Sequence, residues 1–262
     1  MELVDSHCHL DDRQFDADRA AVLERARSAG LKYLLAIGTG EGPPDLSAGV
    51  RLAEQHSFIY ATVGVHPNDA EKTTPDTFTH LEALLGHHKV KAMGEIGLDY
   101  HWGVPKETQL PVFRQQLRMA AEARLPIVIH TRDAWEDTLE ELKTHWVPSG
   151  LGCLMHCFTG SAKQAQECVD LGFFIAFGGV TTFPKSVPTQ EAARLVPADR
   201  MLLETDSPYL APIPYRGKRN EPAYVAHTAK VIAELRGVST EVLAAQTTNN
   251  FERFFGIGAT VA

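Results

Sequence analysis

Short apolar runs alternate with amphipathic segments along the whole sequence, and this alternation limits the chain to few folds. A strand pattern followed by a helix pattern recurs eight times, without a long linker or a low-complexity tract. The expected strands are residues 2–5, 33–37, 59–65, 90–94, 127–130, 152–156, 173–177 and 201–204. The clearest helix patterns are residues 19–29, 109–123, 138–146 and 161–171, each ending near a glycine or a proline.

Strands as apolar as these are typical of a parallel sheet that is covered on both faces. Eight strand–helix units in roughly 250 residues suit a closed barrel. We therefore expect an α/β fold, a single (β/α)8 TIM barrel spanning residues 1–262 as one domain. The seventh helix, around residues 189–195, is short, and residues 240–255 are expected to form an extra C-terminal helix. An open doubly wound sheet is the alternative, but no glycine-rich phosphate loop follows the first strand.

Composition and charge exclude some classes of function. The net charge of −8 argues against a protein that coats nucleic acid nonspecifically, although it leaves a nuclease possible. No basic stretch followed by an apolar one opens the chain, and residues 173–180 are too short an apolar run to cross a bilayer. We expect a cytoplasmic protein without membrane contact or an obligatory protein partner. Its four cysteines are expected to be reduced and mostly buried.

Two histidines follow the first expected strand. His7 and His9 are two residues apart, so in an extended chain their side chains leave the same face, with Cα atoms roughly 6.6 Å apart. Cys8 then points away, and the two imidazoles can share one ion. A capped turn that begins at Asp5 and Ser6 is the alternative interpretation.

Four more residues of metal-ligand type come from the ends of other expected strands. Glu95 ends the fourth strand between glycines, His130 ends the fifth, His156 ends the sixth and Asp206 ends the eighth. In a TIM barrel the carboxyl ends of the strands meet on one face, where the chemistry takes place. Taken singly, these residues could be a salt-bridged carboxylate, two hydrogen-bonded core histidines and a turn cap. Together they predict a metal site, with Glu95 bridging two ions through its two oxygens.

Other polar residues are expected around this site. Glu204 lies two residues before Asp206 and is expected to support a ligand. His66, after the third strand, is expected to contact a substrate oxygen, unless it is only a turn histidine before Pro67. Further substrate contacts are expected from Tyr100 and from three cations after the eighth strand, where barrels often bind phosphate: Arg216, Lys218 and Arg219. A solvated loop is the alternative for those cations.

At these positions the chain resembles the TatD-type family of metal-dependent deoxyribonucleases, within the amidohydrolase superfamily of TIM barrels. The matching segments are residues 5–9 (DSHCH), 64–67 (GVHP), 94–100 (GEIGLDY), 156–160 (HCFTG), 203–210 (LETDSPYL) and 216–222 (RGKRNEP). The resemblance implies metal-dependent hydrolysis of DNA phosphodiesters, often from the 3′ end, with the six ligand positions as proposed above. It also implies a second substrate class, because the family carries a link to removal of D-amino acids from tRNA. Related amidohydrolases often bridge their metals with a modified lysine, whereas Glu95 takes that place here.

The residues and the resemblance together predict two-metal hydrolysis. Two divalent ions, about 3.5 to 4 Å apart, would activate a water and polarise the scissile phosphate. Asp206 is expected to act as the base, with Glu95 and His66 as further catalytic residues. The ligand set suits zinc or manganese by softness, and magnesium remains open. The expected substrate is DNA, single-stranded or at its 3′ ends. The alternatives are an ester hydrolase acting on aminoacyl-tRNA ends and a non-catalytic metal-binding scaffold protein.

Overall fold

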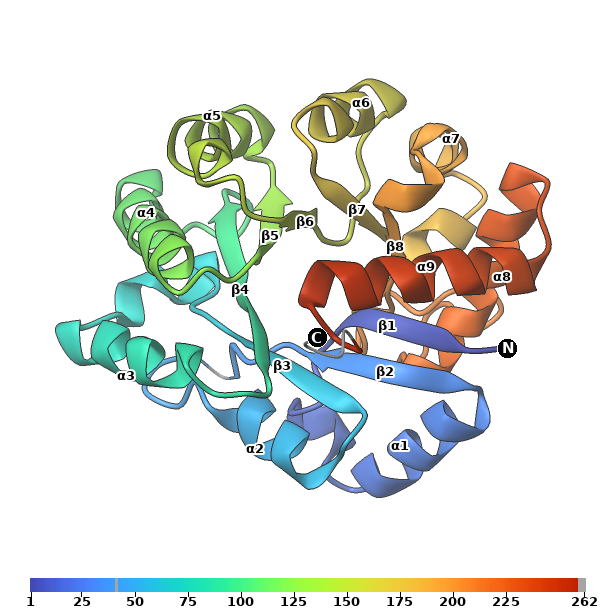
Figure 1. Cartoon of the computed structure of the whole chain (residues 1–262), viewed down its shortest axis with the longest axis horizontal. Coiled ribbons are helices and arrows are strands. Elements are labelled where there is room, and N and C mark those ends of the chain that lie inside the picture. The colour runs from blue at the N-terminus through green and yellow to red at the C-terminus, as the bar shows by residue number, and fades with distance from the viewer. Residues whose placement is uncertain (41, 259–262) are drawn as a thin grey trace. The chain divides into compact units, whose positions relative to one another are not determined.

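The computed structural model describes residues 1–40 and 42–258, which divide into two compact units. The first unit comprises Met1–Ala36 and the chain from His156 onward, and the second comprises Ile37–Met155. Both units are built from strands that alternate with helices (Figure 1).

Eight strands form one sheet in the order of the sequence. The first unit contributes β1 (Leu3–Cys8), β2 (Leu31–Ala36), β7 (Phe174–Phe177) and β8 (Met201–Leu203). The second contributes β3 (Ile59–Val63), β4 (Val90–Asp99), β5 (Ile127–Arg132) and β6 (Cys153–Met155). The strand pairs within each unit are parallel, and a parallel bridge joins Cys8 to Ser207, beyond β8. Sequential parallel strands with a link from last to first have the connectivity of a (β/α)8 barrel, which confirms the predicted fold class.

The helices follow the predicted alternation in both units. The first unit holds α1 (Arg19–Ser28), α6 (Ala162–Asp170), α7 (Val187–Leu195), α8 (Val225–Arg236) and α9 (Thr240–Phe255). The second holds α2 (Ala48–Gln55), α3 (Pro75–Leu85), α4 (Lys106–Glu122) and α5 (Trp135–His145).

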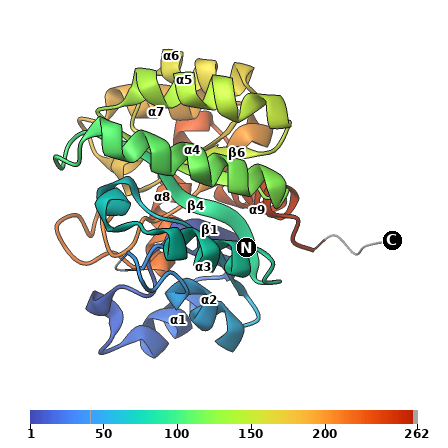
Figure 2. The same cartoon turned by 90° about the vertical axis from the view of Figure 1, so that its left-hand side faces the viewer.

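The predicted C-terminal helix is confirmed. Helix α9 begins after Ser239, whose hydroxyl accepts a hydrogen bond from the amide of Val242, and it ends at Gly256 with φ of 61°. It packs on β1 and α8 within the first unit (Figure 1). In the second unit α4 packs against β4, and Figure 2 shows the two elements next to each other.

Three strands continue beyond their predicted ends: β1, β4 and β5, of which β5 runs to Arg132, so that His130 lies in its interior rather than at its end. Strand β1 runs on to Cys8 because Asp5, Ser6 and His7 are fully buried although they are polar. Strand β4, expected to end at residue 94, continues to Asp99. The polar residues ended the apolar runs on which the prediction depended, so the strands appeared to stop early.

The extension of β4 depends on a glycine. Gly97 pairs with His130 of β5 and has φ of 144°. A Cβ atom on Gly97 would collide with the carbonyl oxygen of His130, so no other residue permits this close pairing. Strand β4 therefore carries Glu95 in its interior rather than at its end, which corrects the predicted placement.

Strands β3, β6 and β8 end earlier than predicted. His66 therefore lies three residues beyond β3, His156 directly follows β6, and Asp206 lies three residues beyond β8.

None of the four cysteines forms a disulfide with another described residue; three of them are buried, and Cys157 is partly exposed. None of the described helices has both the length and the apolar character required to cross a membrane.

Candidate metal centre

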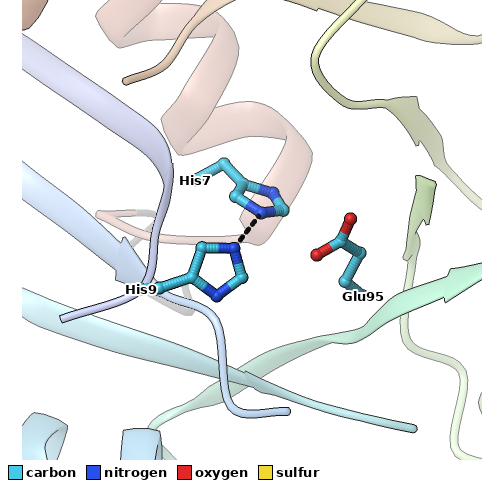
Figure 3. Close-up of side chains that lie close together, drawn as sticks. All are labelled: His7, His9 and Glu95. Atoms are coloured by element: carbon cyan, nitrogen blue, oxygen red, sulfur yellow. Dashed lines mark hydrogen bonds between the residues drawn. The ribbon is translucent and has the colours of Figure 1, made fainter. Parts of the chain in front are cut away.

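Strand β1 and the residue that follows it present two histidines on one face. The Nε2 atoms of His7 and His9 lie 3.3 Å apart, as the dashed line in Figure 3 shows. Cys8 points the other way, where its Sγ donates to the carbonyl oxygen of Leu35 on β2. The alternation predicted for this segment is confirmed.

Asp5 fixes the strand that carries these histidines. Its Oδ1 accepts the amide of His7 at 3.2 Å and the amide of Thr205 at 2.9 Å. Its Oδ2 accepts the hydroxyl of Thr205 at 2.6 Å. Burial raises the pKa of Asp5 to about 8, although these three donors oppose the shift. Asp5 therefore joins β1 to the turn after β8, rather than starting a loop.

The same turn places Asp206 beside the two histidines. The amide of Asp206 donates to the carbonyl of His7, and the amide of His9 donates to the carbonyl of Ser207. Asp206 Oδ1 then lies 3.7 Å from His7 Nε2 and 3.4 Å from His9 Nε2. Burial acts to raise the pKa of Asp206, but the hydrogen bond from His9 and the charges of the nearby histidines outweigh it and lower the pKa.

His156 completes the donor set of the first unit. Its buried ring stacks on that of His7, with centroids 3.7 Å apart. Glu204 Oε1 accepts the amide of Cys157 at 2.6 Å and lies 3.4 Å from His156 Nδ1. Ligand atoms of His7, His156 and Asp206 all lie within 4.8 Å of one another, a spacing that one metal ion can span.

The second unit holds another donor set, centred on His130. Its Nδ1 lies 2.7 Å from Glu95 Oε1, and its Nε2 lies 2.9 Å from Asp99 Oδ2. His66 Nε2 lies 3.7 Å from the same oxygen of Glu95, while His66 Nδ1 accepts the amide of Asn68. Ligand atoms of His66, Asp99 and His130 again lie within 4.8 Å of one another.

Asp99 is a member of this set that was not predicted from the sequence. Its side chain is almost completely buried, and its Oδ1 accepts the amide of His101. Burial acts to raise the pKa of Asp99, but the hydrogen bonds from His130 and His101 lower it. The signal was present, since Glu95 and Asp99 stand four residues apart and so share a face of an extended strand.

The predicted substrate contacts have partners of their own. The hydroxyl of Tyr100 donates to Asp137 Oδ2 at 2.7 Å. Arg219 donates to both carboxylate oxygens of Asp18, each at 2.7 Å.

The other two cations of the loop after β8 are exposed. The guanidinium of Arg216 lies over the ring of Phe183, 4.4 Å from its centroid, and Lys218 lies in the same exposed turn.

The donor atoms in each unit fit divalent metal ions. Imidazole nitrogens and carboxylate oxygens are the ligands that zinc and manganese bind in proteins. Burying several such groups together is costly unless a cation or hydrogen bonds compensate their charge. In the first unit, Glu204 Oε2 is buried and accepts no hydrogen bond from any described residue. A buried carboxylate oxygen without a partner indicates that the donor set of the first unit lacks a cation or a hydrogen-bond donor.

Comparison with known proteins agrees with this chemistry. A family model described as TatD related DNase matches residues 4–256. An uncharacterized metal-dependent hydrolase, YabD of Bacillus subtilis (strain 168), is 43% identical over 256 residues, which cover 97% of this chain and 99% of that protein. The 3'-5' ssDNA/RNA exonuclease TatD of Klebsiella pneumoniae (strain 342) is 38% identical over 262 residues, which cover 97% and 98% of the two chains.

A solved structure supports the same assignment. The crystal structure of YJJV, a TatD homolog from Escherichia coli K12, matches with a TM-score of 0.89 and 32% sequence identity, over 97% of this chain and 98% of that one. The TIM-barrel fold and the hydrolase class predicted from the sequence are both confirmed. The chain belongs to the TatD-related DNase family and is a metal-dependent hydrolase acting on ester bonds.

Proposed function

We propose that this protein hydrolyses DNA phosphodiester bonds from the 3′ end with two divalent ions. The observation that carries the proposal is that each unit has its own set of nitrogen and oxygen donors, at buried or partly buried positions. One set is His7, His156 and Asp206, and the other is centred on His130, which lies between Glu95 and Asp99 with His66 nearby.

The ions would be held by the six positions expected from the sequence, which are His7, His9, Glu95, His130, His156 and Asp206. Glu95 would serve as a carboxylate ligand, because its side chain offers two oxygens. The number of imidazoles favours zinc or manganese over magnesium. When bound, such ions lower the pKa of water and polarise a phosphate oxygen.

The protein's own groups would position the reactants and move the proton. Asp206 would accept or steer the proton of the attacking water, since its carboxylate is 13% exposed and directed at two imidazoles. Glu204 would orient the ring of His156, because its Oε1 lies 3.4 Å from His156 Nδ1. His66 would contact a substrate oxygen, because its Nδ1 is held by Asn68 and its Nε2 is directed toward Glu95.

The surface that binds the phosphates of the substrate strand, called the phosphate track below, would depend on the exposed cations after β8. Arg216 and Lys218 are the stronger candidates, because Arg219 already binds Asp18. Tyr100 would contribute through its ring more than through its hydroxyl, which is bound to Asp137. We further propose that residues 1–262 work as one hydrolase domain in the cytoplasm, without an obligatory protein partner.

Two other functions remain to be tested against this one. Hydrolysis of an ester at an aminoacyl-tRNA end would use the same donors. A non-catalytic metal-binding scaffold is less favoured, because each of the six positions still carries a ligand-type side chain.

One assay separates these functions. The same preparation would be given 3′-labelled single-stranded DNA, duplex DNA, RNA and aminoacyl-tRNA, each with titrated manganese, magnesium and zinc. We expect stepwise release of nucleotides from the 3′ end of single-stranded DNA. Deacylation of tRNA without nuclease activity would contradict the proposal, and inactivity on every substrate would favour the scaffold function.

A further inference from the structure

The loop between β4 and α4 exposes a tryptophan. Trp102 is 64% exposed, whereas tryptophan side chains are largely buried on average. An isolated exposed apolar residue is common and needs no function. The residues around Trp102 therefore have to show whether its exposed ring could bind a ligand.

The loop is held firmly at both ends by one buried side chain. Gln109 of α4 accepts the amide of Asp99 at 2.8 Å through its Oε1. Its Nε2 donates to the carbonyls of Asp99 at 2.6 Å and Val104 at 2.8 Å. A clamp of this kind limits the loss of entropy when a ligand binds, so Trp102 is presented in advance.

A short chain of contacts ties Trp102 to the donor set. The rings of His101 and Trp102 meet in a T-shaped arrangement, with centroids 4.9 Å apart and planes at 84°. The amide of His101 donates to Asp99 Oδ1 at 2.8 Å, and Asp99 Oδ2 lies 2.9 Å from His130 Nε2. Three successive contacts thus connect the exposed ring to a histidine of the proposed metal centre.

A cation accompanies the ring. The guanidinium of Arg132, the last residue of β5, lies 5.4 Å from the centroid of Trp102 and is exposed. An aromatic face combined with an arginine is the arrangement with which proteins bind single-stranded nucleic acids. The bases stack on the ring, and the cation adds to the stacking or meets a phosphate.

We propose that Trp102, assisted by Arg132, stacks an unpaired nucleobase of the substrate strand close to the bond that is cut. The proposal rests on the proposed function, because it assumes that the substrate is a nucleic acid. It explains how an acidic protein can hold a strand without a broad positive surface. A base inside a duplex already has neighbours on both faces, so this contact selects for unpaired ends.

The test compares two oligonucleotides on three forms of the protein. One is a short single-stranded phosphorothioate DNA, whose linkages slow hydrolysis, and the other lacks its 3′-terminal bases. Binding of each to the parent, Trp102→Ala and Trp102→Phe is measured by anisotropy of a 5′ label, on protein as purified. Quenching of tryptophan emission provides a second readout of stacking.

We expect removal of the bases to weaken binding to the parent by roughly 5- to 150-fold. Trp102→Ala should bind both oligonucleotides with the same affinity, and Trp102→Phe should keep part of the preference for the intact strand. The matched control is Leu195→Ala, an apolar side chain at the end of α7 that is 68% exposed, and it should keep the full preference.

Two results would overturn the inference. In the first, Trp102→Ala retains the preference of the parent for bases. In the second, the parent itself binds the two oligonucleotides equally, in which case the exposed ring serves some other contact, such as a protein partner. The proposed function is tested separately, by cleavage of unmodified DNA. It would be wrong if the parent did not cut this DNA with any metal, whatever the binding experiment shows, because the preference for bases is measured without turnover.

Discussion

The rings of His7 and His156 stack on one another, with centroids 3.7 Å apart and planes inclined by 14°. Both side chains are buried, although 149 positions separate them in the sequence. Imidazole nitrogens that come from distant parts of the chain and lie this close together are typical ligands of a divalent metal ion. The stack is therefore best explained as a preformed part of a metal centre.

Removal of metal is the first prediction. The purified protein should contain about two equivalents of divalent metal, and exhaustive chelation should abolish hydrolysis. Added manganese, zinc or magnesium should restore it. Metal content by plasma mass spectrometry and turnover of labelled DNA check both points. Hydrolysis that survives chelation would rule out the metal-dependent mechanism.

Chelation should leave the secondary structure intact, because the apolar core of the strands does not depend on the donor residues. The protein should nevertheless unfold at a lower temperature after chelation, since ions that bind only the folded state stabilise it, and the stabilisation increases with their affinity. Circular dichroism with and without chelator measures both effects.

The role of Asp206 is the second prediction. Asp206→Asn keeps the shape of the side chain but removes a charge and a proton acceptor, so turnover should fall about 10²-fold or more. Glu95→Ala should instead lose bound metal. Asp76→Asn, which changes an exposed carboxylate in the first turn of α3, is the matched control and should behave as the parent does. Near-normal turnover of Asp206→Asn at saturating metal would show that Asp206 is not the base.

The order of strands and helices could be predicted from the sequence because it depends on local patterns. Apolar runs and amphipathic periods report directly on burial, and α9 was predicted with the bounds that the structure has. The alternation at His7 and His9 is equally local, so the direction of both rings followed from the geometry of an extended chain.

The parts that were missed depend on contacts between distant residues. Asp5 was predicted only to end the first strand, because nothing near it indicates that Thr205, 200 positions away, donates two hydrogen bonds to it. Asp99 was left without a role because Glu95 seemed to end its strand. Burial of polar groups, which a hydropathy pattern cannot anticipate, accounts for both omissions.

The clamp on the loop after β4 is the third prediction. Gln109→Ala would leave the amide and carbonyl of Asp99 and the carbonyl of Val104 without their partner, so the free energy of unfolding should fall by about 1–3 kcal/mol. Urea denaturation gives this value. Gln115→Ala, on the partly exposed side of the same helix, is the control and should cost much less. Equal effects of the two substitutions would show that the clamp has no special importance.

The phosphate track is the fourth prediction. Each phosphate neutralised on a single strand contributes roughly −0.7 to the slope of log affinity against log salt. Changing Arg216 and Lys218 together to Gln should therefore flatten the slope by about 1.4 if each contacts one phosphate. Arg219→Gln should change the slope less, because Asp18 already neutralises that guanidinium. An unaltered slope in the double variant would show that the cations form only a solvated turn.

The ion pair between Arg219 and Asp18 leads to the fifth prediction, which concerns stability and pH. The hydrogen bond from Arg219, with help from Arg25, lowers the pKa of Asp18 from 3.8 to about 2. Because the pKa is lower in the folded state, the pair stabilises the protein fully above the unfolded value near 4. That contribution is lost as the pH falls through about 2.

Arg219→Gln should accordingly be less stable than the parent by the same amount at pH 7 and pH 5, and the difference should shrink at pH 3. Urea denaturation at the three pH values measures this. Arg216→Gln is the control, because Arg216 lies over the ring of Phe183 and should show no such dependence on pH. A stability difference for Arg219→Gln that stays constant down to pH 3 would mean that Arg219 acts through packing on Phe15, over whose ring it lies, rather than through the charge of Asp18.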